Sequence, residues 1–163
     1  MAELSLAQSQ SSVALDTGET LFTVVTAINT CGYDQELGVS DPLRKRVRSQ
    51  VARVRQSSQE AKDAIQTMCQ YYEAHRPPEN SKLLAEYVSL SLYLNPPPNL
   101  TLKGKEADLP PDATAVVGIL PLLQKFYEAE GLHGIWEGDR EAYSGLTERY
   151  HQALAKMLFD TEI

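Results

Sequence analysis

Apolar residues recur every three or four positions along most of this chain, in segments that prolines and glycines separate. The clearest segment follows Ser40-Asp41-Pro42, where a capping side chain precedes a proline whose missing N–H costs nothing in the first helical turn. The apolar residues that follow are Leu43, Val47, Val51 and Val54. Their spacing of four, four and three places them on one face of a helix that runs to about Gln56. A chain patterned in this way buries its apolar surface by packing helices against one another.

Similar signals predict further helices on both sides of this one. Their expected starts are Asp16 or Thr17, Ser57-Ser58, Asn80 or Ser81, Asp112, and Gly138 or Asp139. Pro121 should kink the helix from Asp112 or begin its main part, and residues 132–136 should form a turn. We therefore expect an all-α fold, an irregular bundle of about six helices in which the second to fourth are consecutive antiparallel neighbours. An α+β fold remains open only if Thr20 to Ile28 is a strand, since its Thr and Val residues also suit one.

The 163 residues suffice for one domain with a real core. Residues 1–15 are rich in Ser, Gln and Ala without a sustained period, so they are expected to form a mobile arm before a single helical domain over 16–163. Residues 95–112 hold five of the nine prolines, which indicates a long surface connection.

The charge of the chain excludes some partners. A formal net charge of -7 gives nucleic acid no electrostatic reason to bind.

Met1 to Val13 has no basic start and no apolar run long enough for a signal peptide or a membrane span. The compartment stays open, because a chain that begins after a removed signal would look the same.

No catalytic, cofactor-binding or metal-binding residue can be assigned from motifs. His75, His133 and His151 are too far apart for two ligands on one helix face, and no glycine-rich phosphate loop is present. Cys31 and Cys69 lack the paired spacing of a zinc site. They could form a disulfide, but two buried thiols are the interpretation that we favour.

The segment from Arg44 to Arg55 carries six cations and no anion. Arg44, Arg46 and Arg48 could therefore contact an anionic partner. The alternative, which we favour, is a solvated face that pairs with the acid-rich segment from Glu128 to Glu148, since the chain as a whole is negative.

The last predicted helix repeats apolar residues every four positions, at Leu146, Tyr150, Leu154 and Leu158. Neither a glycine nor a basic last turn terminates it. We therefore hypothesise that the protein continues beyond Ile163, and that Phe159 and Ile163 are partly exposed and contact the continuation.

Three stretches resemble a known family. They are Thr17-Gly18-Glu19-Thr20-Leu21-Phe22, Ile28-Asn29-Thr30-Cys31-Gly32-Tyr33-Asp34 and Ser40-Asp41-Pro42-Leu43-Arg44. They are similar to the N-terminal helical region of a family of uncharacterised, exported bacterial proteins. The resemblance implies a second, metallopeptidase-like domain that is absent from this chain, and it transfers no functional residue because its motifs only start and stop helices.

Two functions remain. The first is a non-catalytic helical accessory or protein-interaction domain of a larger bacterial protein. The second is a small hydrolase-type enzyme that uses Glu and Tyr residues in a cleft beside the proline-rich connection. An enzyme should gather titratable groups with perturbed pKa values in its main pocket, whereas a pocket lined by aliphatic and Tyr side chains favours binding.

Overall fold

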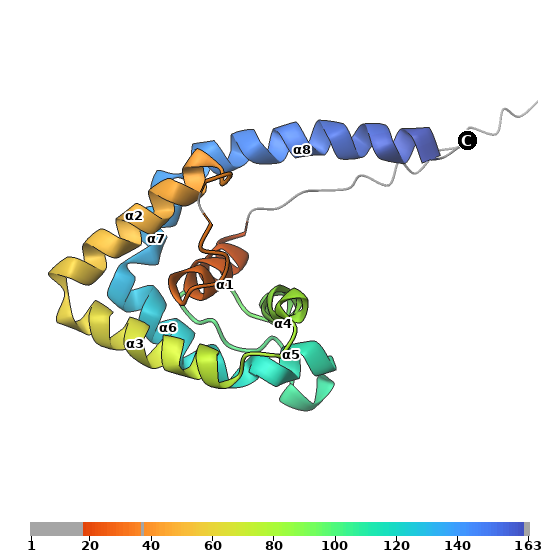
Figure 1. Cartoon of the computed structure of the whole chain (residues 1–163). Coiled ribbons are helices and arrows are strands. Elements are labelled where there is room, and N and C mark those ends of the chain that lie inside the picture. Colours follow the sequence, from red (N-terminus) through yellow and green to blue (C-terminus); the bar gives the residue numbers. More distant parts are fainter. Residues whose placement is uncertain (1–17, 37, 162–163) are drawn as a thin grey trace, which may run out of the picture.

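The structure is a computed structural model that describes residues 18–36 and 38–161 (Figure 1). The expected arm, residues 1–15, lies outside this part of the chain. The α-helices are α1 (Glu19–Thr30), α2 (Pro42–Ser57), α3 (Gln59–Ala74), α4 (Asn80–Leu92), α5 (Pro111–Val116), α6 (Leu120–Glu130), α7 (Leu132–Gly138) and α8 (Arg140–Thr161). Two short 3-10 helices, η1 (Glu106–Asp108) and η2 (Val117–Ile119), complete the elements. The described residues form no strand, so the predicted all-α irregular bundle is confirmed.

Helix α1 is the centre of the bundle and contacts α2, α3, α4, α6 and α7 (Figure 1). Val24, Ala27 and Ile28 are each 1% exposed. The Thr23 and Thr30 hydroxyls donate to the carbonyls of Glu19 and Thr26, both at 2.8 Å, so the helix itself satisfies polar groups that a core would otherwise leave unpaired. The strand alternative for this segment is therefore wrong.

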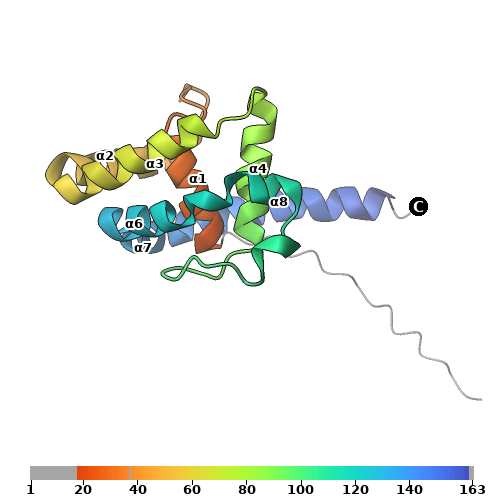
Figure 2. The ribbon, with the colours of Figure 1, turned by 90° about the horizontal axis from the view of Figure 1, so that it is seen from below.

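Local side chains start and stop the helices that surround α1. Asp41 caps α2 by accepting a hydrogen bond from the Leu43 N–H at 2.8 Å. Ser58 both ends α2 and caps α3, accepting from the Ala61 N–H at 3.1 Å, which makes α2 and α3 neighbours. Helix α4 departs from the expected order, because it packs mainly on α1 and α5 (Figure 2).

The segment from Pro111 to Gly138 contains more breaks than expected. Pro121 lies in the first turn of α6 and so begins that helix instead of kinking a longer one. The backbone at Gly118 comes so close to α3 that a Cβ there would lie 2.7 Å from the Tyr71 hydroxyl. Gly131 ends α6 with a left-handed φ of 60°. Residues 132–138 then form helix α7, so the turn expected at 132–136 was wrong; Leu132 is fully buried there.

The proline-rich connection is anchored to the core and is not only a surface crossover. Leu94 and Leu102 form an antiparallel bridge, with the Asn95 N–H donating to the Thr101 carbonyl at 2.7 Å. Leu100, between them, is fully buried. The bridge thus closes a loop whose apolar tip belongs to the main core.

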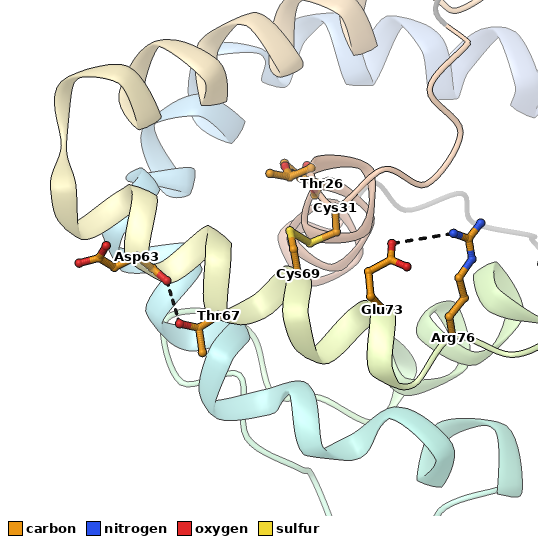
Figure 3. The surroundings of a disulfide bond; sticks show 8 residues. Thr26, Cys31, Asp63, Thr67, Cys69, Glu73 and Arg76 are labelled. Carbon is orange, nitrogen blue, oxygen red and sulfur yellow. Dashed lines mark hydrogen bonds and ion pairs between the residues drawn. A yellow bond between two sulfur atoms is a disulfide. The ribbon is translucent and has the colours of Figure 1, made fainter.

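Cys31 and Cys69 form a disulfide, so the favoured pair of free thiols is wrong. Figure 3 shows the bond joining the end of α1 to the middle of α3. The two cysteines are separated by 38 residues, and their Cα atoms lie 4.9 Å apart. Helix α2 and the loop before it lie between them in sequence, so the bond closes a loop that contains α2 and fixes its two ends at α1 and α3.

Helix α8 leaves the bundle after its first turns. It begins beside α7, its main contact, and its second half extends beyond the other helices in both views (Figures 1 and 2). Across the described residues, none of the helices combines the length and apolar character needed to cross a membrane.

Replacing Cys31 and Cys69 by serine should lower the free energy of unfolding by about 3–4 kcal/mol, because the bond restricts a long loop of the unfolded chain. Urea denaturation of the oxidised protein, with and without the double substitution, measures the loss. The unsubstituted protein with reductant is the control and should resemble the variant. Two titratable thiols in the oxidised, denatured protein would contradict the disulfide itself.

Candidate functional site

The main apolar cavity lies between α1, α2 and the start of α8 and has a volume of about 330 Å³. Its apolar lining comes from all three helices: Leu21, Phe22, Val25, Leu43, Val47, Val51, Tyr143 and Leu146. Phe22 and Tyr143 meet edge to face, with ring centroids 5.6 Å apart, and so connect α1 to α8. Burial raises the pKa of Tyr143, chiefly through desolvation with a smaller contribution from Asp139, so this hydroxyl stays neutral at physiological pH. We call this cavity the α1–α2–α8 groove.

Arg44 lies at one edge of the groove and is engaged in holding the loop before α2. Its guanidinium donates to the Asp34 carboxylate at 2.5 Å and to the Asp34 carbonyl. It also reaches the Asn29 side-chain oxygen and the Ser40 hydroxyl, both at 3.1 Å. These contacts join α2 to the end of α1 and to the loop between the two helices, which indicates a structural role for Arg44.

Arg46 also has a partner within the fold. Its Nε lies 2.7 Å from Oδ1 of Asp139, a carboxylate that is 5% exposed at the start of α8. The expected pairing of the basic helix with the acid-rich segment is therefore confirmed for this pair. Asp139 Oδ2 has no hydrogen-bond partner among the described residues, so Arg46 supplies the main compensation for a buried charge.

Arg48 differs from both, because it lines the groove while its Nη1 is buried without a hydrogen-bond partner among the described residues. The predicted partner surface of Arg44, Arg46 and Arg48 is thus divided: two of the three side chains stabilise the fold, and Arg48 contributes an uncompensated donor. Of the other two candidates, the Phe159 side chain and the whole of Ile163 lie outside the described residues.

The apolar face of α8 continues outward from the groove. Leu146 lines the groove, while Tyr150 and Met157, one and three turns further along, are 66% and 65% exposed. Leu154, between them, is half-buried, so this face is exposed chiefly at Tyr150 and Met157. We call Tyr150, Leu154 and Met157 the outer stripe of α8.

A polar cluster joins the start of α1 to α6 and α7. Glu19 Oε1 accepts a hydrogen bond from the Tyr127 hydroxyl at 2.8 Å and lies 2.9 Å from His133 Nδ1. Burial raises the pKa of Tyr127, and the hydrogen bond to Glu19 raises it further. Next to His133 lies Trp136, with the Arg140 guanidinium 5.5 Å from its ring centroid.

A histidine whose Nδ1 faces a carboxylate can present Nε2 as a base, which is the chemistry that the enzyme hypothesis needs. Here, however, the His133 side chain is 65% exposed, and neither it nor Tyr127 lines any of the three main cavities. The geometry is that of a contact that ties α1 to α6 and α7.

The two other main cavities are more polar. One, of about 1060 Å³, lies over the disulfide between α2 and α3 and is lined by five glutamines among other residues. The other, of about 640 Å³, lies between α3 and α6. Within the described part of the chain, no residue from 95 to 112 lines any of the three, so the cleft that the enzyme hypothesis places beside the proline-rich connection gains no support.

Glu130, at the end of α6, is a buried acid that the sequence suggested was a surface residue. It is 1% exposed, and neither carboxylate oxygen has a hydrogen-bond partner among the described residues. Desolvation raises its pKa to about 7, although the charge of Arg55 opposes the shift. It lines none of the three cavities, so it is a source of pH-dependent stability and not part of the groove.

The described residues contain no group of three His, Cys, Asp or Glu side chains that could hold a metal ion. Comparison with protein-family models, with curated proteins and with solved structures finds no match. The groove and the outer stripe are therefore the features on which a function can be argued.

Sequence reasoning found the cations of α2 and the stripe of α8 but missed the groove. Phe22, Val47 and Tyr143 each read as ordinary core positions, and no local pattern places them around one cavity. The acid-rich segment was the one signal that pointed to the Arg46–Asp139 pair.

Replacing Arg46 by alanine should lower the free energy of unfolding by about 1–3 kcal/mol, because it leaves the Asp139 carboxylate buried and unpaired. Arg53 is the matched control: it lies on the same helix, is exposed, and should cost less than about 0.5 kcal/mol when changed to alanine. Urea denaturation at neutral pH measures both. Equal losses would contradict a specific role for Arg46.

Replacing Glu130 by glutamine should stabilise the protein at pH 8 and have little effect at pH 4.5. The folded protein holds the Glu130 proton more tightly than the unfolded chain does, so its contribution to stability is complete below about pH 4.5 and is lost as the pH rises through 7. The gain at pH 8 should reach up to about 3 kcal/mol. Glu128→Gln, the same change on the exposed face of α6, is the control and should show no such difference between the two pH values.

Proposed function

We propose that this chain is a non-catalytic accessory domain of a larger bacterial protein, and that the outer stripe of α8 docks on the following domain of that protein. The observation that carries the proposal is the exposure of Tyr150 and Met157 on a face that is partly buried at Leu146. A helix with an apolar stripe gains stability mainly by burying that stripe. The spacing of four, four and three from Leu146 to Met157 suits packing against another helix.

The chemistry of the other candidate sites supports a binding role over a catalytic one. The α1–α2–α8 groove is lined mostly by aliphatic and aromatic side chains, and its one carboxylate, Asp41, is engaged as the cap of α2. His133, which faces the Glu19 carboxylate, lies outside the three cavities. An active site would instead bring such groups together in a pocket.

The disulfide supports the exported location that the family resemblance implies. Disulfides persist in oxidising compartments such as the bacterial periplasm and are rare in the cytosol of most bacteria. One of the two bonded cysteines, Cys31, lies in one of the three stretches that carry the resemblance. We therefore include export in the proposal.

Hydrogen exchange tests the docking by comparing residues 1–163 alone with the longer protein that the gene encodes. The backbone amides of residues 147–157 should exchange rapidly in the short chain and at least about tenfold more slowly in the longer one, because docking suppresses local opening. Tyr150→Asp in the longer protein should restore rapid exchange. Val39→Asp, which adds the same charge at a loop residue that is 98% exposed, is the control and should change nothing in α8.

Equal exchange in the two chains would contradict the proposal, as would a reading frame that ends at Ile163. Slow exchange in the short chain that disappears on dilution and with Tyr150→Asp would identify a second copy as the occupant and would also overturn it.

A further inference from the structure

We propose that the α1–α2–α8 groove is a binding site for a small amphipathic carboxylate, an unbranched alkyl chain of about eight carbons whose carboxylate pairs with Arg48. This site is independent of the docking role of α8, because neither Tyr150 nor Met157 lines the groove. Three properties of the groove support this ligand: its apolar lining, the buried Nη1 of Arg48 and its volume.

The lining suits an alkyl chain. Eight of the residues around the groove are aliphatic or aromatic, and they come from three different helices. Small-molecule sites in proteins are concave and mostly apolar, with a few polar groups that orient the ligand. An alkyl chain gains about 0.8 kcal/mol for each methylene that it buries in such a place.

The polar groups of the groove favour an anion over a cation. Among the residues that the structure describes, the Arg48 Nη1 is buried without a partner. Arg44 adds a second positive charge, and its buried Nε likewise has no partner within the described residues. Asp41 is the carboxylate among the lining residues, and it is engaged as the cap of α2. An unpaired buried donor is costly, so an acceptor supplied by a ligand would remove that cost.

The neighbours of Arg48 on α2 show why this residue is available. Arg44 is held by Asp34, and Arg46 by Asp139. Arg53 reaches the Ser49 carbonyl at 3.3 Å on the exposed side of the helix. Arg48 therefore combines a place in the apolar lining with a buried Nη1 that no other described residue satisfies. A carboxylate is the anion that matches a guanidinium at the end of an alkyl chain.

The volume of the cavity suits a chain of this length. A volume of about 330 Å³ holds about ten non-hydrogen atoms if each takes the share of a liquid water molecule, about 30 Å³. Octanoate has about that many atoms by the same measure. Shorter acids would leave the groove partly empty and lose the contacts that its lining offers.

The test is titration of the protein with octanoate, followed by calorimetry and by methyl NMR of the valines and leucines. Binding should be saturable with a Kd below about 1 mM, and the shifted signals should include Val25, Val47 and Leu43. Octanol, which keeps the chain but lacks the carboxylate, should bind at least about tenfold more weakly.

Three variants locate the site. Arg48→Gln should weaken octanoate binding by about 10–100-fold and leave octanol unchanged, because it removes a charged hydrogen-bond donor. Arg53→Gln removes the same charge from the same helix outside the groove and should leave both affinities within about twofold. Val25→Phe should fill the cavity and weaken both ligands. Thermal unfolding of each variant confirms that it folds.

Three results would overturn the proposal. They are the absence of saturable octanoate binding, equal affinity of Arg48→Gln and the unsubstituted protein, and equal affinity for octanoate and octanol. Signals that shift only around the disulfide or on the outer stripe of α8 would place the ligand elsewhere and would overturn it as well. None of these results bears on the hydrogen-exchange test of docking, so the two proposals can fail separately.

Discussion

The burial of α1 is the constraint on which the rest of the structure depends. A helix of 12 residues can be covered by five others only if its buried polar groups find partners within the protein. The Thr23 hydroxyl donates to the Glu19 carbonyl, and the Asn29 side-chain oxygen accepts from Arg44. Contacts from distant parts of the chain then hold both ends of the helix. Glu19 anchors its start to α6 and α7, and the Cys31–Cys69 bond anchors its end to α3. The groove exists because α2 and α8 cover one side of α1 without filling the space above Val25.

The helices could be predicted from the sequence because their boundaries are decided by neighbouring residues. Asp41 and Ser58 cap the helices that they precede, and Gly131 ends α6 through its own backbone conformation. Helix α7 was missed because Leu132-His133-Gly134 resembles a turn when its burial is unknown. The surface connection predicted over residues 95–112 does not hold at Leu100, which the core covers completely although prolines flank it on both sides.

The candidate site could be predicted only in part, because its interactions join residues that are far apart in sequence. Glu19 and His133 are separated by 114 residues, and no periodicity relates them. The sequence showed the charges of Arg46 and Arg48 but not their environments. Arg46 pairs with the buried carboxylate of Asp139, whereas Arg48 lines the apolar groove. The cysteines carried too little local information to decide between thiols and a disulfide. Their pairing depends on the tertiary packing that brings α3, after α2, next to the end of α1.

The length of α8 has a mechanical consequence. Its 22 residues span about 33 Å at the usual rise of an α-helix. Tyr143 and Leu146, near its base, are part of the groove, while its second half extends beyond the bundle (Figure 1). The base of the helix is therefore held at the wall of the groove, while its other end is far from that wall. The far end lies about 22 Å beyond Leu146, so a rotation of about 10° at that wall would move it by about 4 Å. Any change in how Tyr143 and Leu146 pack that turned the helix would therefore be felt most at its far end.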